Sequence, residues 1–408
     1  MKIAFLTENY YSGGLDTFLV NLINHWPQPE DELVLICNRT HPGLAVIREN
    51  VTRPCTFVCH SMPLYGEMVV SMQHASVAAR LRQLAAPLLR YLFFLQHVIA
   101  LRELLRHVNP DRLMAVNGGH PGGDSCRAAV VAWAQAAKDK PRAVYNFHNL
   151  AVRPRWFELP QEYCVDHLLA RLAGAVVGVS KACAESMLAR FALAASGKVS
   201  HIYNGIGEVV AEKSPPAARL RDELGIPQAS PVCLLLATYE PRKGHDFLLR
   251  AFAKVTREVP DAHLVMCGFG YSDQVARVRD AVSRMNLSRS VHLLEFRKDA
   301  AALLQQSDAL LVSSQQYESF GLTIVEAMTQ SVPVVATRVG GIPEVLVDGE
   351  GGTCVAPDDV DGFAAGIVKL LKDKAYAKSQ GERGRKRYEQ CFTADRMARE
   401  YADLIRRP

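Results

Sequence analysis

The chain has 408 residues, enough for two α/β domains of ordinary size, and its 49% hydrophobic and 22% charged residues exclude a disordered or fibrous protein. The net charge of +5 arises in residues 1–200, which hold 20 Lys and Arg against 15 Asp and Glu. So mild a charge predicts no nucleic-acid partner. The local excess is either ordinary scatter or a basic face that attracts an anionic partner such as phospholipid.

The ten cysteines are dispersed, with no CxxC pair and no Cys/His spacing typical of a zinc site, so we expect free thiols in a reducing compartment. Residues 1–10 lack the apolar core of a signal peptide, and the longest apolar stretch, residues 84–105, is interrupted by charged and histidine side chains. These features predict a cytoplasmic protein that does not span a membrane, with peripheral contact at its inner face as an open possibility.

In chain order, each half of the sequence opens with a short apolar strand, a glycine turn and a helix. The first half has a strand at 2–7 followed by Gly13 and Gly14, and the second has a strand at 232–238 followed by a turn at 241–244. This order is typical of βαβ units in a parallel sheet. Further strands are predicted at 33–37, 112–116, 143–147, 175–179, 200–203, 262–267, 291–294, 309–313 and 333–336. The predicted fold class is therefore α/β with two doubly wound sheets.

The composition changes at residues 208–230, which are polar and carry three prolines. We interpret them as a linker between an N-terminal domain at 1–207 and a C-terminal domain at 231–386. Residues 387–408 predict a charge-rich final helix that packs back toward the N-terminal domain. Because ligands bind at the carboxyl ends of strands in open α/β sheets, we expect the functional site in a cleft between two facing sheets.

Residues 87–108 are strongly apolar, with basic side chains at Arg90, Arg102 and Arg106. One interpretation is a helix that contacts a membrane surface or a lipid-linked molecule. The other interpretation, which we favour, is a buried helix of the N-terminal domain.

The most informative segment is 313–326, in which an apolar strand runs through a loop into a helix that begins near Gly321. A glycine there lets backbone N–H groups approach a ligand closely, and N–H groups at a helix N-terminus favour phosphate. Glu318 precedes this helix, and Glu326 lies two turns along it. Residues 339–344, Val-Gly-Gly-Ile-Pro-Glu, give either a second backbone suited to close approach or a plain strand-to-helix turn.

The letters E-S-F-G-L-x-x-x-E at 318–326, followed by P-V-V-A-T-x-x-G-G-I-P-E at 333–344, resemble the donor-site signature of glycosyltransferase family 4, whose members have the GT-B fold. The resemblance extends over both halves of the chain and is weakest at residues 60–110. Its further segments are Gly13-Gly14, His148, 179–187, 202–206, 241–249, 267–270 and 297–299.

The resemblance implies two Rossmann-like domains that face a central cleft. It implies a retaining enzyme that transfers a sugar from a UDP- or GDP-linked donor to a saccharide or lipid-linked acceptor, in surface polysaccharide or lipopolysaccharide biosynthesis. Because no cluster of metal-ligating residues stands near the donor motif, we also expect that no cofactor and no metal is required. The leaving phosphate itself would accept the proton of the acceptor hydroxyl, so no protein nucleophile would be needed.

The resemblance also assigns roles to side chains. Lys243 would stabilise the leaving phosphates, Glu318 would bind hydroxyls of the transferred sugar, and His148 would hydrogen-bond the sugar near the reacting carbon. Glu326 would accept hydrogen bonds from the ribose. The other donor-binding residues that the resemblance implies are Gly13, Gly14, Thr238, Arg242, Gly268, Arg297, Ser319, Phe320, Gly321 and Leu322.

One position departs from the family pattern. Thr238 stands where members often carry an arginine ahead of the lysine segment, so either a phosphate charge is missing or Arg242 supplies it. Two other features are ambiguous. Asp359-Val360-Asp361 has the spacing of a metal-binding D-x-D, but we interpret it as a helix cap. His120 is predicted either to line the acceptor side or to sit in a turn.

Two rival functions are open from the sequence. A nicotinamide-dependent oxidoreductase on similar sheets is disfavoured because Gly268-x-Gly270 lacks the third glycine of a dinucleotide fingerprint. A catalytically silent subunit that only binds a partner glycosyltransferase is disfavoured because the residues that would carry the chemistry are all present.

Overall fold

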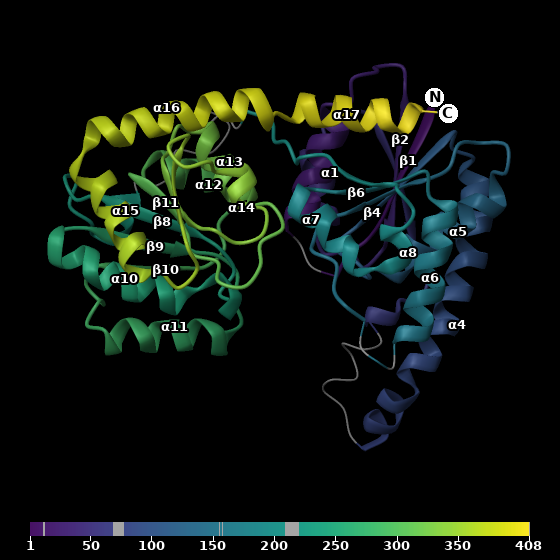
Figure 1. Cartoon of the computed structure of the whole chain (residues 1–408), viewed down its shortest axis with the longest axis horizontal. Helices are drawn as coiled ribbons and strands as arrows, with labels where there is room; N and C mark the ends of the chain where they lie inside the picture. Colours follow the sequence, from purple (N-terminus) through teal and green to yellow (C-terminus); the bar gives the residue numbers. More distant parts are fainter. Residues whose placement is uncertain (11–12, 68–76, 155, 157, 209–219, 408) are drawn as a thin grey trace. The chain divides into compact units, whose positions relative to one another are not determined.

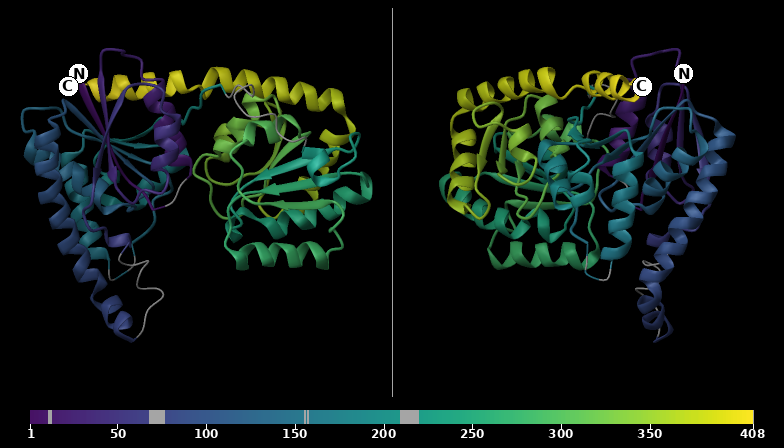
Figure 2. Two further views of the ribbon diagram at one scale, coloured as in Figure 1. Left: turned by 180° about the vertical axis from the view of Figure 1, so that it is seen from behind. Right: turned by 45° about the vertical axis from the view of Figure 1, so that its right-hand side comes forward.

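The computed structural model describes residues 1–10, 13–67, 77–154, 156, 158–208 and 220–407 (Figure 1). The chain forms two compact units: unit 1 comprises Met1–Gly205 and Ala394–Pro408, and unit 2 comprises Ile206–Thr393. Each unit is an open parallel sheet with helices on both faces (Figure 2). The predicted α/β class with two doubly wound sheets is therefore confirmed.

The sheet of unit 1 has the strand order β3-β2-β1-β4-β5-β6-β7, and every neighbouring pair is parallel. Its strands are β1 (Lys2–Glu8), β2 (Glu32–Asn38), β3 (Cys55–His60), β4 (Arg112–Asn117), β5 (Val144–Phe147), β6 (Ala175–Gly178) and β7 (Val199–His201). The chain direction across the sheet reverses between β1 and β4. The carboxyl ends of these two strands therefore form the topological switch point, where open α/β sheets bind ligands.

Helices cover both faces of this sheet. They are α1 (Gly14–Asn24), α2 (Leu44–Asn50), α4 (Val77–Val108), α5 (Asp124–Ala136), α6 (Leu159–Leu172), α7 (Lys181–Ser186), the single 3₁₀ turn η1 (Met187–Ala189), α8 (Phe191–Ala194) and α17 (Ala394–Arg406). The last helix, α17, packs on α1. Tyr401 of α17 lies edge-on to Phe18 at 5.5 Å between ring centroids, and its hydroxyl accepts a hydrogen bond of 2.8 Å from Asn146. A segment from the end of the described chain thus completes the core of unit 1.

Helix α4 has two apolar faces. Phe94, Val98, Leu101 and Leu105 are buried, and the helix packs against α5. The buried-helix interpretation of residues 87–108 is therefore confirmed for one face. In the part of α4 whose side chains are described, the opposite face exposes Leu92, Leu95 and Ile99, each at 58–60% of its full area. Among the helices that the structure describes, none is long and apolar enough to cross a membrane.

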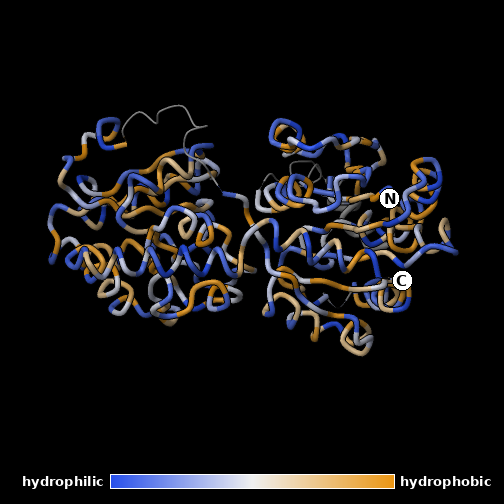
Figure 3. The backbone as a smooth tube through the Cα atoms, turned by 90° about the horizontal axis from the view of Figure 1, so that it is seen from above, coloured by the Kyte–Doolittle hydropathy of each residue, from blue (hydrophilic) through white to orange (hydrophobic). Residues whose placement is uncertain are grey.

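The sheet of unit 2 has the parallel order β10-β9-β8-β11-β12-β13. Its strands are β8 (Val232–Leu236), β9 (His263–Cys267), β10 (Val291–Leu294), β11 (Ala309–Val312), β12 (Val334–Thr337) and β13 (Gly352–Val355). Its helices are α9 (Leu220–Leu224), the 3₁₀ turn η3 (Pro241–Lys243), α10 (His245–Glu258), α11 (Ser272–Arg284), α12 (Ala300–Gln305), α13 (Leu322–Thr329), α14 (Ile342–Val345), α15 (Val360–Lys372) and α16 (Lys374–Cys391). Hydrophobic and hydrophilic residues alternate along helices of both units (Figure 3), as expected where one helix face is buried and the other is exposed.

Three elements differ from the sequence prediction. Strand β3 was not predicted, because Cys, Thr and His interrupt its apolar pattern, and β13 was not predicted, because it follows Gly351 and begins with Gly352. The prediction of a single final helix over 387–408 is wrong: α16 ends at Cys391 and α17 begins at Ala394. The helix breaks because the carbonyl of Phe392 accepts the N–H of Ile206 instead of continuing the helical ladder.

Candidate active site

The turn after β8 presents Lys243 at the carboxyl edge of the unit 2 sheet. Gly244 ends the turn with a φ of 73°, and a Cβ on it would lie 2.0 Å from the carbonyl oxygen of Ser313. Only glycine allows this close approach. The Ser313 hydroxyl donates to the carbonyl of Lys243 (2.8 Å), and the N–H of Gln315 donates to the carbonyl of Arg242 (2.9 Å). The loop after β11 is therefore fixed directly to the turn that carries Lys243.

Lys243 and Glu318 form an ion pair at this edge. The Lys243 Nζ lies 2.5 Å from the Glu318 Oε2, and the two side chains are 17% and 15% exposed. Arg242 takes other partners: its Nε lies 2.5 Å from the Glu240 Oε2, and its guanidinium lies 5.1 Å from the centre of the Tyr317 ring. The two neighbouring cations thus point to different groups, and only Lys243 contacts the carboxylate ahead of α13.

The loop before α13 depends on glycine at two places. Gly321 has a φ of 95° and precedes the first residue of the helix, Leu322, so the first N–H groups of α13 have no acceptor within the helix. Gly340 has a φ of 54°, and the N–H of Gly341 donates to the carbonyl of Glu318 at 2.8 Å. Gly340 and Gly341, for which the sequence left two interpretations open, therefore hold the backbone of Glu318 in place.

Two further predicted residues of this loop have distinct surroundings. Phe320 is buried and meets Phe392 edge-on at 5.7 Å between ring centroids, so it anchors the loop in the core. Ser319 and Leu322 are half-buried beside it. The anchored loop thus holds Glu318 just ahead of the N-terminus of α13.

Glu326 is a half-buried carboxyl in α13 with no hydrogen-bond or ion-pair partner among the residues that the structure describes. Burial raises its pKa from the ordinary 4.5 to about 7, because the charged form loses water without gaining a cation. A carboxyl in this state is suited to accept hydrogen bonds from hydroxyl groups of a ligand.

The ends of β8 and β9 bring Thr238 and Gly268 together. A Cβ on Gly268 would lie 1.9 Å from the carbonyl of Ala237, so the two chain segments approach as closely as glycine permits. The Thr238 hydroxyl is buried and has no hydrogen-bond partner in the described part of the chain. Arg297 donates hydrogen bonds to Asp299 (2.6 Å) and Glu223 (2.7 Å), and its bonds to the Asp299 carboxylate raise its pKa above the ordinary value. Its charge is therefore already paired.

Exposed aromatic side chains lie at the same edge; the sequence analysis included Phe269 in the segment 267–270 but missed Tyr271 and Phe296. Phe269 and Tyr271 follow β9, and Phe296 follows β10; they are 55%, 58% and 66% exposed. Phe269 and Tyr271 meet edge-on at 5.5 Å between ring centroids. The signal that could have found them is their position, since each comes within four residues of the end of a strand.

In unit 1, His148 directly follows β5. Its main-chain N–H donates to the carbonyl of Asn117 at 3.0 Å, and its ring meets Phe18 edge-on at 4.3 Å between centroids. The Nε2 atom is buried and has no hydrogen-bond partner among the described residues. Burial lowers the pKa of His148 to about 3, so the ring is neutral at physiological pH. A neutral ring with one unpaired nitrogen can form a hydrogen bond with a ligand hydroxyl.

Gly13 and Gly14 open α1 beside β1. The N–H of Gly13 donates to Asp16 Oδ2 at 2.9 Å, and Asp16 Oδ1 lies 2.7 Å from His41 Nε2. A Cβ on Gly13 would meet no atom of the described residues within 4 Å, apart from its own neighbours in the chain. This glycine pair therefore offers main chain, and no charge, to a ligand.

Possible metal ligands are already neutralised. His120, Glu162 and Asp166 in unit 1 place one ligand atom each within 4.8 Å of one another. However, Arg190 donates to both carboxylates and Arg127 donates to Glu162 at 2.9 Å, so these oxygens serve ion pairs. In unit 2, Asp359 accepts the N–H of Gly362 at 2.8 Å and caps α15, which confirms the helix-cap interpretation of the D-x-D segment.

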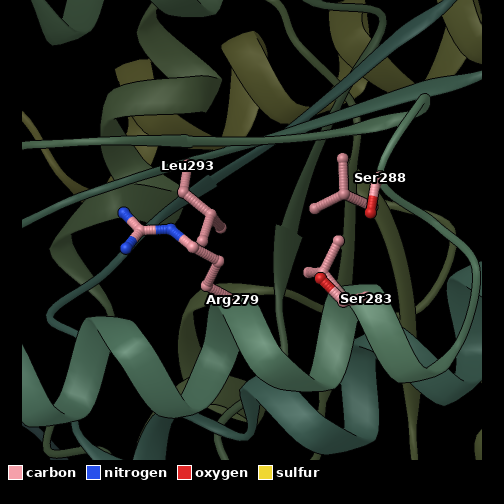
Figure 4. A pocket seen from close by; sticks show the side chains of 6 residues that line it. Arg279, Ser283, Ser288 and Leu293 are labelled. Atoms are coloured by element: carbon pink, nitrogen blue, oxygen red, sulfur yellow. The ribbon is translucent and has the colours of Figure 1, made fainter.

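A hollow of about 240 Å³ lies elsewhere in unit 2, between α11 and the edge strand β10 (Figure 4). It is lined by Arg279, Val282, Ser283, Ser288, Val291 and Leu293. None of the residues predicted from the sequence lines it, and it offers one cation and no carboxylate. The geometry therefore favours the edge that carries Lys243 as the candidate site.

Replacing Gly340 with alanine is expected to destabilise unit 2. A Cβ there would lie 2.0 Å from the carbonyl oxygen of Glu318, in a conformation that alone costs other residues about 1–3 kcal/mol. Urea unfolding followed by circular dichroism measures the loss. Gly349→Ala is the matched control, since Gly349 has a φ of 80° but no atom within 4 Å of its Cβ position. Equal losses in the two variants would show that the contact with Glu318 is not the constraint.

Two family models match the chain in succession. The model described as Glycosyltransferase Family 4 matches residues 12–207, and the model described as Glycosyl transferases group 1 matches residues 217–387. Together they cover most of both units. The boundary between them falls next to the boundary between unit 1 and unit 2.

Curated relatives resemble part of the chain. The N-acetyl-alpha-D-glucosaminyl L-malate synthase of Bacillus anthracis is 32% identical over 206 residues, which are 50% of this chain and 53% of that protein. The GDP-mannose-dependent alpha-(1-6)-phosphatidylinositol monomannoside mannosyltransferase of Mycolicibacterium smegmatis is 32% identical over 202 residues, 47% of this chain and 51% of that protein. The chain thus matches about half the length of these relatives.

Solved structures resemble the whole chain in fold. Anabaena HepE in complex with UDP has a TM-score of 0.74 at 21% identity and covers 99% of each chain. The glycosyltransferase WaaG of lipopolysaccharide biosynthesis has a TM-score of 0.65 at 16% identity and covers 100% of each chain. The fold is therefore GT-B, and with both family models matched, the chain belongs to the group 1 glycosyltransferases of family 4.

Proposed function

We propose that the protein is a retaining glycosyltransferase. It transfers a hexose from a UDP- or GDP-linked donor to a saccharide or lipid-linked acceptor, in the assembly of a surface polysaccharide or lipopolysaccharide. The observation that carries this proposal is the group of Lys243, Glu318 and Glu326 around the N-terminus of α13. It combines a cation and the N–H groups of a helix N-terminus, which suit phosphate, with carboxylates, which suit hydroxyl groups; phosphates and hydroxyl groups are the parts of a nucleotide sugar.

The names of similar proteins support the choice of donor. One curated relative is named as GDP-mannose-dependent, and Anabaena HepE has been solved with UDP and with UDP-glucose. The choice of UDP or GDP as the nucleotide, and the presence of a sugar on it, are therefore proposed for this chain.

The donor phosphates would bind Lys243 and the first N–H groups of α13, between Gly321 and Leu322, because both favour negative charge. Thr238 offers its unpaired hydroxyl beside them. Glu326 would accept the ribose hydroxyls. The base would lie over Gly268 toward Phe269 and Phe296, whose exposed rings are suited to stacking on a base. Arg297, being paired with acidic neighbours, would shape this loop more than contact the donor.

The transferred sugar would contact Glu318 through its hydroxyls and His148 through the unpaired Nε2, with the backbone of Gly13 and Gly14 beside the phosphates. In the transfer, the bond between the anomeric carbon and the phosphate oxygen breaks, and the acceptor oxygen bonds to that carbon on the same face. The acceptor proton goes to the departing phosphate oxygen. The protein stabilises the negative charge of the leaving phosphates and orients the donor sugar. We therefore propose that neither a cofactor nor a metal takes part.

Screening against a panel of nucleotide sugars tests this function. We expect one UDP- or GDP-sugar to raise the melting temperature and to be hydrolysed slowly without acceptor, with or without EDTA. No stabilisation and no hydrolysis with any donor would contradict the function. Hydrolysis that stops in EDTA and returns with magnesium or manganese would contradict the proposed independence from metal.

Lys243→Ala should lower kcat/KM by about 10²–10³, the loss typical of removing one preorganised charge stabiliser. Arg242→Ala should cost much less, because Arg242 already pairs with Glu240 and stacks on Tyr317. Thr238→Arg should raise the rate by restoring a second phosphate charge. Steady-state kinetics with one donor measure all three variants. Equal damage from Arg242→Ala and Lys243→Ala would show that Arg242 binds the phosphates.

Affinity for UDP or GDP should rise as the pH increases through about 7, the raised pKa of Glu326. Below this value the carboxyl is protonated and accepts ribose hydroxyls weakly; above it the carboxylate gains charged hydrogen bonds of about 1.5–3 kcal/mol. Calorimetry from pH 6 to pH 8 measures the change. Glu326→Gln cannot ionise and should keep only the dependence that comes from the nucleotide phosphate. An identical pH dependence in the two proteins would rule out a contact between Glu326 and the ribose.

We also propose peripheral membrane contact through the exposed face of α4. Leu92, Leu95 and Ile99 share one helix face with Arg102 and Arg106, which both pair with Glu103 at the surface. The apolar side chains can enter an anionic lipid interface while the arginines exchange Glu103 for the headgroups. Co-sedimentation with vesicles rich in phosphatidylglycerol should be lost in Leu95→Glu/Ile99→Glu. Absence of binding by the unaltered protein, or binding that this variant retains, would contradict the contact.

A further inference from the structure

The segment that carries His148 is held at four main-chain positions. One of these bonds involves the last residue of β4, one involves the loop after it, and two involve the region around η1. They join His148 N–H to the Asn117 carbonyl (3.0 Å), Ala151 N–H to Ser186 Oγ (2.8 Å), Val152 N–H to the His120 carbonyl (2.8 Å) and the Val152 carbonyl to Arg190 Nη1 (3.1 Å). The position of His148 is therefore set by groups outside its own strand.

His120 lies at the centre of a directed chain of hydrogen bonds. Asn117 Nδ2 donates to the Tyr145 hydroxyl at 2.8 Å, and this hydroxyl lies 3.1 Å from His120 Nδ1. His120 Nε2 lies 2.9 Å from Asp166 Oδ1. Since the Tyr145 oxygen already accepts from Asn117, its O–H donates to Nδ1, and Nε2–H donates to the carboxylate. These partners fix one neutral tautomer of His120.

A buried ion-pair network anchors the far end of this chain. Arg190 Nε donates to Asp166 Oδ2 at 2.7 Å, and Arg190 also pairs with Glu162. Its buried members are three cations and three anions, all at most 6% exposed: Arg90, Arg127, Arg190, Asp124, Glu162 and Asp166. Arg90 also lies 3.7 Å from the partly exposed carboxylate of Glu158. Because the buried charges balance one another, a neutral His120 fits among them, and burial lowers the pKa of His120. Burial opposes ionisation of Asp166, but hydrogen bonds from His120 and Arg190 bring its pKa below the ordinary value.

His120 thus connects the network to both ends of the His148 segment. Its ring acts through Tyr145 and Asn117 on the start of the segment, and its carbonyl holds Val152 at the end. Buried charges and hydrogen bonds tolerate little change in geometry. If one member of such a network is displaced, the atoms that it holds in place therefore shift as well.

We propose that His120 is a positioning residue, which sets the orientation of His148 through the main chain of residues 117 and 148–152. This inference rests on the proposed function insofar as His148 contacts the donor sugar. It differs from both interpretations of His120 drawn from the sequence, since the ring neither lines the site nor only closes a turn.

The first measurement needs no substrate. In protein labelled with ¹⁵N-histidine, ring signals of His148 are assigned by their loss in His148→Gln. His120→Leu, which keeps the side-chain volume but removes both ring nitrogens, should shift these signals. His120→Gln, which can still donate to Asp166, should shift them less. His167→Leu is the matched control, because His167 follows Asp166 on α6 and its side chain is exposed, and it should shift nothing.

The second measurement is kinetic, with the donor that the screen identifies. His120→Leu should lower kcat by about 10- to 100-fold, the range expected for a misplaced reacting contact, while UDP or GDP affinity stays unchanged. His120→Gln should recover most of the rate, and His167→Leu should match the unaltered protein. If His120→Leu does not fold, Tyr145→Phe removes a single oxygen of the same chain and should give the same two effects.

Unshifted His148 signals and an unchanged kcat in a folded His120 or Tyr145 variant would overturn the inference. Shifted signals with unchanged kcat would overturn it as well, since positioning would then be without consequence. If the unaltered protein uses no donor at all, the proposed function fails, while the ring signals still decide whether His120 orients His148.

Discussion

In a parallel sheet all strands end at the same edge, and this constraint decides where the functional side chains of the protein lie. Lys243 and Glu318 are 75 positions apart in the sequence, but each follows a strand of one sheet, and their charged atoms lie 2.5 Å apart. In unit 1 the same rule places the loop after β4 against the segment after β5, which carries His148. Short loops on buried strands thus give the candidate site its precision.

The buried polar groups that matter for the site are of two kinds, those with partners in the fold and those without. In unit 1 the ion-pair network satisfies six charges within the fold, so it fixes geometry and leaves little for a ligand. At the edge of unit 2, the Thr238 hydroxyl and the Glu326 carboxyl have no partner within the described chain. A buried polar group without a partner costs about 1–3 kcal/mol. Such groups persist where a ligand supplies the missing hydrogen bonds, which is the character of a binding site.

Most strands could be predicted from the sequence because short apolar runs before glycine turns are a local signal, and β10 was placed at its observed residues, 291–294. Segments whose order comes from distant contacts could not be predicted. The break between α16 and α17 depends on Ile206, and β13 is hidden by its glycines. For the site, the motifs shared with the family indicated Lys243, Glu318 and Glu326. They carried no signal for the contact partners of Arg297, nor for the network around His120, because these come from side chains that meet only in the fold.

The central claim is that the edge of unit 2 around α13 binds the nucleotide part of a sugar donor. Amide hydrogen exchange, followed by mass spectrometry with and without UDP or GDP, tests it most directly. The account predicts slower exchange in peptides covering 241–249 and 318–328, where N–H groups and Lys243 would meet the phosphates. It predicts no change at residues 279–293, which border the hollow between α11 and β10 (Figure 4). Protection confined to that hollow, with exchange at 318–328 unaltered by either nucleotide, would contradict the account.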